Sequence, residues 1–163
     1  TDIYFSLGKA FEDLKDYDLN SESSTERLIN HMSPYVMASL WAVHRSEVLI
    51  TCLDFISRTR TYSTAAAVEV QISMITAWHG KIRVLNELMW LRSYENDNIW
   101  WSYGNLTVAR WFRESKYKKE VHEFIKSIAC LTGCDPKYIR LALKRNTIDS
   151  EKMLKKITLI ISL

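Results

Sequence analysis

Glycine and proline are scarce in this sequence, with four Gly and two Pro among 163 residues. This scarcity argues against collagen-like, low-complexity and turn-rich all-β proteins. Long apolar runs are also missing, because no uncharged segment reaches the roughly 18 residues that a membrane-spanning helix needs. The first residues lack the basic and then apolar layout of a signal peptide. We therefore expect an intracellular protein, in the cytoplasm or, if it is viral, in the host cell, without a membrane partner.

Cysteine is limited to three residues, so complete pairing is impossible and reduced thiols are the simpler expectation. Cys130 and Cys134 are separated by three residues, and no fourth ligand follows at the spacing of a zinc finger. The histidines are scattered, with no spacing typical of a catalytic triad. Dinucleotide-binding, P-loop and nucleophile-elbow motifs are absent. We therefore expect no enzyme activity, no cofactor and no metal.

The charges are unevenly distributed along the chain. Residues 1–109 carry 9 Lys and Arg against 13 Asp and Glu, a net charge of −4. Residues 110–163 carry 13 against 6, a net charge of +7. This asymmetry favours a polyanionic partner for the C-terminal third. We expect a single helical domain over residues 1–163, with residues 1–109 as an acidic scaffold or assembly body and residues 110–163 as a basic nucleic-acid-binding part.

Apolar residues recur at helical spacing through most of the chain. The pattern predicts an all-α fold, a compact bundle of about eight or nine helices. The expected helices span approximately residues 3–14, 23–33, 34–57, 65–78, 81–94, 105–115, 117–132, 136–145 and 150–160. Residues 34–57 carry apolar side chains on nearly every face, so we expect this segment to be the central helix. Gly80 and Asn105 are expected to cap the neighbouring helices.

The sharpest local pattern is a pair of short predicted helices joined by a break at residues 133–135. Asp135 can cap the second helix, and Pro136 occupies its first turn, where a missing N–H costs nothing. Residues 125–144 resemble the helix-turn-helix of DNA-binding regulators. The resemblance covers about 20 residues.

The resemblance implies particular packing roles. Ala129 and Gly133 match the small residue and the turn glycine that let the two helices cross closely. Ile128, Ile139 and Ala142 match the residues that pack between the helices. Thr132 and Cys134 depart from the family, which more often has aliphatic residues there. The string from Gly133 to Arg140 is also faintly similar to the ends of small bacteriophage DNA-binding proteins.

By the same resemblance, the outer face of the second helix lies in the major groove of DNA. Arg140 would make a bidentate contact with a guanine edge. Lys137, Lys144 and Arg145 would contact phosphates, and Leu141 completes the face.

A second basic element precedes this motif. Its cations are Arg110, Arg113, Lys116, Lys118 and Lys119. They alternate with Trp111, Phe112 and Tyr117, and a mixture of this kind can hold phosphates while its rings stack on bases. A core position is the competing interpretation for Trp111 and Phe112, whereas Trp100 and Trp101 lie in a predicted loop.

The sequence thus favours a DNA-binding protein, regulatory or related to packaging, that contacts duplex DNA in preference to RNA or single strands. Two alternatives stay open: an RNA or single-stranded nucleic-acid binder similar to a viral nucleoprotein, and a helical protein–protein interaction module. A homo-oligomer is attractive, because two helix-turn-helix units about 34 Å apart read two half-sites on one face of the duplex.

Overall fold

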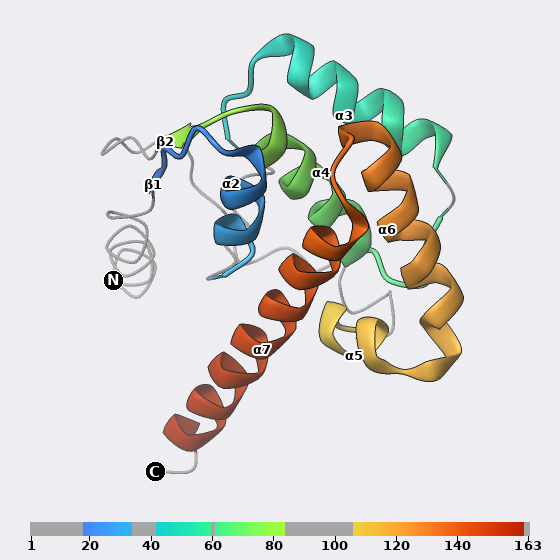
Figure 1. The fold of residues 1–163 in the computed structure, drawn as a ribbon. Coiled ribbons are helices and arrows are strands. Elements are labelled where there is room, and N and C mark those ends of the chain that lie inside the picture. The colour runs from blue at the N-terminus through green and yellow to red at the C-terminus, as the bar shows by residue number, and fades with distance from the viewer. Residues whose placement is uncertain (1–17, 34–41, 60, 84–105, 162–163) are drawn as a thin grey trace, which may run out of the picture.

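The structure is a computed structural model that describes residues 18–33, 42–59, 61–83 and 106–161, with side chains described up to residue 148 (Figure 1). The elements in this part are β1 (Asp18–Leu19), α2 (Ser24–His31), α3 (Ser46–Arg58), α4 (Ala66–His79), β2 (Ile82–Arg83), α5 (Val108–Arg113), the 3₁₀ helix η3 (Ser115–Tyr117), α6 (Lys118–Thr132) and α7 (Pro136–Ile161). The fold is mostly helical, as predicted. The described part holds six α-helices rather than eight or nine. The helix expected at residues 3–14 lies outside it.

The central helix is α4, which begins and ends within a residue of the prediction. Every residue from 70 to 77 is buried, because α4 packs against α2, α3 and α6. Gly80 ends the helix in an extended conformation, with φ −155° and ψ 165°, and its N–H donates to the Thr76 carbonyl.

The prediction of a central helix over residues 34–57 was wrong. The helix in this region, α3, begins at Ser46, after non-helical residues 42–45, whereas residues 34–41 lie outside the described part. Only Cys52 is fully buried on α3, and Ile50 and Leu53 are 64% and 55% exposed. The apolar pattern gave a wrong prediction of burial, because the pattern is the same for a helix covered on all sides and for one that leaves apolar residues in solvent.

A small antiparallel sheet was not predicted. Leu19 pairs with Ile82 and Asp18 with Arg83, so the segment after Gly80 is extended where we expected a helix over residues 81–94. Residues 84–94 of that expectation lie outside the described part. The strand forms through backbone hydrogen bonds to a segment some 60 residues away, which local propensity cannot reveal.

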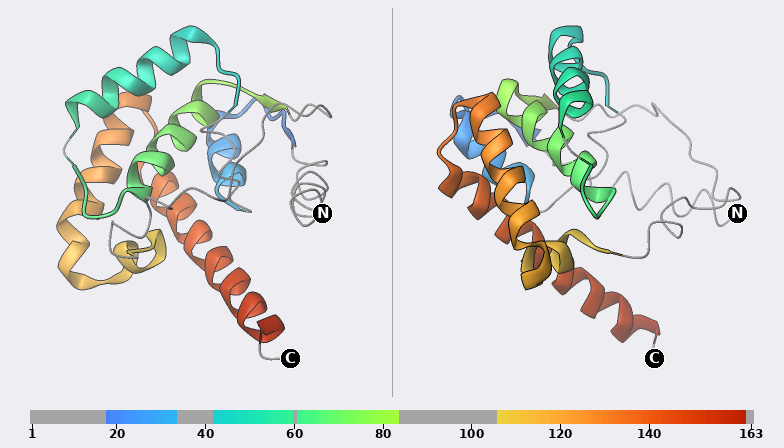
Figure 2. Two further views of the ribbon diagram at one scale, coloured as in Figure 1. Left: turned by 180° about the vertical axis from the view of Figure 1, so that it is seen from behind. Right: turned by 90° about the vertical axis from the view of Figure 1, so that its right-hand side faces the viewer.

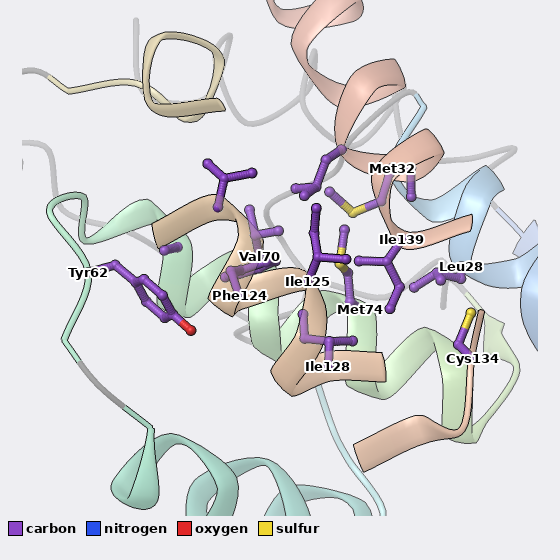
Figure 3. Packing of buried hydrophobic residues seen from close by; sticks show 14 of the residues in the cluster. Leu28, Met32, Tyr62, Val70, Met74, Phe124, Ile125, Ile128, Cys134 and Ile139 are labelled. Atoms are coloured by element: carbon purple, nitrogen blue, oxygen red, sulfur yellow. The ribbon is translucent and has the colours of Figure 1, made fainter. Parts of the chain in front are cut away.

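The main hydrophobic core lies between α2, α4, α6 and α7. Figure 3 shows Leu28 of α2, Met74 of α4, Ile125 of α6 and Ile139 of α7 gathered between these helices, and all four are buried. A group of three aromatic rings extends this core toward α5. Tyr62, Trp111 and Phe124 meet edge to face, with centroids 5.3 to 5.7 Å apart.

The C-terminal helix α7 is continuous, whereas we expected two helices over residues 136–145 and 150–160. The polar residues between them do not interrupt it. Asn146 and Thr147 are buried, and the Thr147 hydroxyl donates to the Lys144 carbonyl one turn earlier at 2.8 Å. The second half of α7 extends past the other described helices (Figures 1 and 2). No helix among the described residues is long and apolar enough to cross a membrane.

Candidate nucleic-acid interface

The α6–α7 hairpin has the turn that the sequence predicts. Gly133 ends α6 in the left-handed conformation, with φ 73° and ψ 7°, and its N–H donates to the Ala129 carbonyl at 2.9 Å. A side chain in this conformation is strained, so glycine is the favoured residue here. Asp135 then caps α7, because its Oδ1 accepts from the Lys137 N–H at 2.9 Å. The chain therefore turns sharply between the two helices.

The packing between the two helices also follows the predicted roles. Ile128, Ile139 and Ala142 are completely buried, and Ala129 is half-buried. Cys134 is 4% exposed and belongs to the same core cluster, so it fills the place of an aliphatic side chain.

Thr132, the other departure from the family pattern, is half-buried. Its hydroxyl donates to the Ile128 carbonyl at 2.7 Å and accepts from the Cys134 N–H at 3.2 Å. Since the hydroxyl has both partners, a polar residue is tolerated in the turn.

The outer face of α7 is exposed. The five residues expected on it are all accessible, namely Lys137, Arg140, Leu141, Lys144 and Arg145. Their positions along the helix place them on the side opposite the buried Ile139 and Leu143.

The second basic element folds as a helix, a 3₁₀ turn and the start of another helix. Thr107 caps α5, because its hydroxyl accepts from the Arg110 N–H at 3.2 Å. The cap expected at Asn105 lies outside the described part. The five predicted cations of this element are all exposed: Arg110, Arg113, Lys116, Lys118 and Lys119.

The fold brings the two basic elements together at a surface pocket of about 520 Å³. Its lining comes from α5, η3, α6 and α7 and comprises Phe112, Ser115, Lys116, Lys118, Lys119, Val121, His122 and Arg140. The sequence did not indicate that the two basic elements lie side by side, because Lys118 and Arg140 belong to different helices. His122 was not among the predicted nucleic-acid contacts, and only its α-helical spacing from Lys118 and Lys119 could have suggested it.

Three of the predicted contact residues are already paired with carboxylates. Glu114 binds Arg110 at 2.9 Å and Lys116 at 3.2 Å. Hydrogen bonds to Lys116 and Arg110 hold the pKa of Glu114 below its usual value. Asp135 likewise binds Lys137 at 2.9 Å, and this hydrogen bond lowers the pKa of Asp135 and raises that of Lys137. These ion pairs compete with a phosphate for the same cations.

Five other predicted contacts form no ion pair with any residue that the structure describes. They are Lys118, Lys119, Arg140, Lys144 and Arg145. Their charges are exposed, so they are the cations best able to contact an external anion.

None of the three aromatic residues of the basic element is fully exposed. Trp111 is completely buried, and its Nε1 donates to the Glu120 carboxylate at 3.0 Å. The core interpretation is therefore confirmed for Trp111. Phe112 and Tyr117 are half-buried, and the Lys116 ammonium lies 4.7 Å from the centre of the Tyr117 ring. Trp100 and Trp101 lie outside the described part.

The three cysteines are free, with Cys130 exposed and Cys134 buried. Within the described ranges, no three His, Cys, Asp or Glu residues come together as a metal site would require. The candidate interface is a surface of exposed cations. No protein-family model matches the chain, and no curated protein or solved structure is significantly similar to it.

Proposed function

We propose that this protein binds duplex DNA, with the outer face of α7 in the major groove and Lys118 and Lys119 of α6 on the phosphate backbone. The observation that carries the proposal is the shared pocket, where Lys118 and Lys119 meet Arg140 of α7. One surface thereby joins the base-reading and the phosphate-binding positions. The proposed biological role is regulation or packaging of DNA.

The types of cation on this surface support the proposal of DNA binding. Lys118, Lys119 and Lys144 are compact charges suited to phosphates, whereas the planar guanidinium of Arg140 is suited to the two acceptors of a guanine edge. Phosphate contacts dominate the affinity of such complexes and release counterions. Binding should therefore be strong at low salt and weaken steeply as salt is added.

Fluorescence anisotropy with duplex DNA at about 50 and 200 mM salt tests the proposal. Four phosphate contacts, from Lys118, Lys119, Lys144 and Arg145, should weaken binding by roughly a hundredfold over this range. A Lys118→Gln/Lys119→Gln double variant should lower both the affinity and the salt slope. Arg58→Gln, an exposed change on α3, is the matched control and should alter neither. Absence of duplex binding by the folded protein would refute the proposal.

Single-stranded DNA and RNA of equal length belong in the same titration. The buried Trp111 does not favour them, because its ring is packed against Tyr62 and Phe124 rather than exposed to a base. A preference for single strands would overturn the duplex assignment.

A second candidate function is protein binding through α3. Leu49, Ile50 and Leu53 are exposed on this helix, and Val43 just before it is 82% exposed. Apolar groups gathered in this way mark interaction surfaces. A second copy of the chain is one partner, which would supply a pair of helix-turn-helix units. Light scattering of the wild type and of Ile50→Glu tests this, since a dimer held by this surface would dissociate in the variant, and a monomeric wild type would exclude self-association.

A further inference from the structure

The pocket between η3, α6 and α7 holds more positive charge than one backbone phosphate requires. Lys116, Lys118, Lys119 and Arg140 all line it. Lys116 is paired with Glu114, which leaves three cations without a carboxylate partner among the described residues. A phosphodiester of DNA carries one negative charge, whereas a phosphomonoester carries about 1.5 to 2 at pH 7. The charge of the pocket therefore matches a terminal or multiple phosphate better than an internal one.

The lining also has an apolar part. Phe112 and Val121 contribute to the wall, and Ser115 and His122 add groups that donate hydrogen bonds. The pocket has a volume of about 520 Å³ and is open to solvent, so a charged ligand can reach its cations directly. A combination of cations with an aromatic side chain suits a ligand that joins phosphate groups to a flat ring system.

We propose that this pocket binds a nucleotide through its terminal phosphate groups, with Lys118, Lys119 and Arg140 on the phosphates and Phe112 against the base or sugar. Two sources share this chemistry: a free nucleoside diphosphate, and the 5′-phosphorylated end of a nucleic acid.

A consequence for regulation follows from Arg140, and this part rests on the proposed DNA binding. Arg140 lines the pocket and also belongs to the exposed face of α7. A phosphate in the pocket would hold the guanidinium away from a base edge and would place negative charge near the DNA backbone. Nucleotide and duplex therefore compete, and by linkage each weakens the binding of the other by the same factor.

Calorimetric titration of the full DNA-free chain with ADP at about 20 mM salt tests the site itself. ADP should bind more tightly than pyrophosphate, and adenosine should not bind measurably. Lys118→Gln should weaken ADP binding by about tenfold, the loss expected for one charge-assisted contact. Lys126→Gln is the matched control, because Lys126 is an exposed cation of α6 that does not line the pocket. A 5′-phosphorylated dinucleotide, compared with its 5′-hydroxyl form, separates the two sources.

The outcomes of this experiment distinguish the two proposals. Absence of binding by both ADP and the phosphorylated dinucleotide would overturn the nucleotide site, as would equal losses in Lys118→Gln and Lys126→Gln. ADP binding without any duplex binding would support the pocket and refute the proposed function. Lys144→Gln should weaken duplex binding while leaving ADP binding unchanged, because Lys144 lies on the α7 face outside the pocket.

Discussion

Trp111 donates its indole N–H to the Glu120 carboxylate at 3.0 Å, and this hydrogen bond links α5 to α6. The same carboxylate accepts from the Ser63 N–H at 3.0 Å and from the Ser63 hydroxyl at 2.6 Å. Glu120 thus joins three segments, and it fixes the position of the helix that carries Lys118 and Lys119.

Replacing Glu120 with Ala should lower the free energy of unfolding by about 1 to 3 kcal/mol, because the buried indole N–H loses its acceptor. Urea denaturation measures the change. Glu47→Ala, an exposed glutamate on α3, is the control and should have an effect within about 0.5 kcal/mol. Equal stabilities for the two variants would contradict the role of Glu120.

Arg27 connects α2 to the C-terminal end of α4. Its side chain is buried, and it donates to the carbonyls of Ala77 at 2.9 Å and Trp78 at 2.6 Å. Carbonyls at a helix C-terminus attract a cation, and no intrahelical donor satisfies them. Arg27→Met should therefore cost about 3 kcal/mol or more of stability, since it leaves these acceptors without their donor.

Arg27→Lys should recover only part of that loss, because a single ammonium lacks the planar fork of donors. Thermal or urea denaturation measures both variants. Arg58→Ala provides the contrast: its ion pair with Asp54 at 2.7 Å is exposed, so the expected change is below about 1 kcal/mol. If the Arg27 and Arg58 variants lose similar amounts of stability, burial of the Arg27 guanidinium does not strengthen its contacts.

His31 predicts a pH dependence of stability. Burial lowers its pKa from 6.5 to about 4, so the folded protein holds this imidazole neutral. The unfolded chain binds a proton at pH values below about 6.5, whereas the folded protein does so only below about 4. Stability should therefore fall as the pH decreases from 6.5 toward 4, by up to a few kcal/mol in total.

Urea denaturation at pH 7 and pH 5 measures this effect. His31→Gln should reduce the difference in unfolding free energy between the two pH values, even where the variant is less stable at both. An unchanged difference would assign the pH dependence to other groups.

Substitution of Gly133, the glycine in the turn between α6 and α7, should lower stability through backbone conformation alone. A Cβ on Gly133 would meet no atom within 4 Å, yet its φ of +73° disfavours other residues. Gly133→Ala should cost about 1 to 2 kcal/mol, and Gly133→Asn should cost less. Gly80→Ala is the control, because Gly80 has a negative φ and its Cβ would lie 4.0 Å from the Thr76 carbonyl oxygen. Thermal denaturation measures the three variants. A larger loss of stability in Gly80→Ala than in Gly133→Ala would contradict this prediction.

The proposed DNA binding predicts different effects for Arg140 and Lys119. Arg140→Ala should relax the preference for a selected sequence, by about 1 to 3 kcal/mol at one position. Lys119→Ala should weaken all duplexes about equally and reduce the salt slope by about one. Anisotropy titrations with a selected and a scrambled duplex distinguish the two. Equal effects of both changes on every duplex would remove the base-reading role of Arg140.

The hairpin was largely predictable because its determinants are local. Gly133, Asp135 and Pro136 dictate where one helix ends and the next begins, and the spacing of Ile128, Ile139 and Ala142 indicates the inner faces. The continuous α7 was missed since Asn146 and Thr147 read as a break, whereas packing against other helices buries both residues. The strand at residues 82–83 was missed for a similar reason, because its partner is distant in the sequence.

Local spacing and composition were enough to predict a mostly helical protein, the sharp turn at Gly133 and the concentration of positive charge after residue 110. The packing of the helices sets which cations lie near one another. Contacts between distant segments bury Trp111 and bring Lys118 beside the same pocket as Arg140. The ion pairs of Lys116 with Glu114 and of Lys137 with Asp135 are local, because each joins residues two positions apart. Burial and the proximity of cations on different helices depend on how the helices pack in three dimensions, and residue spacing along one helix does not contain that information.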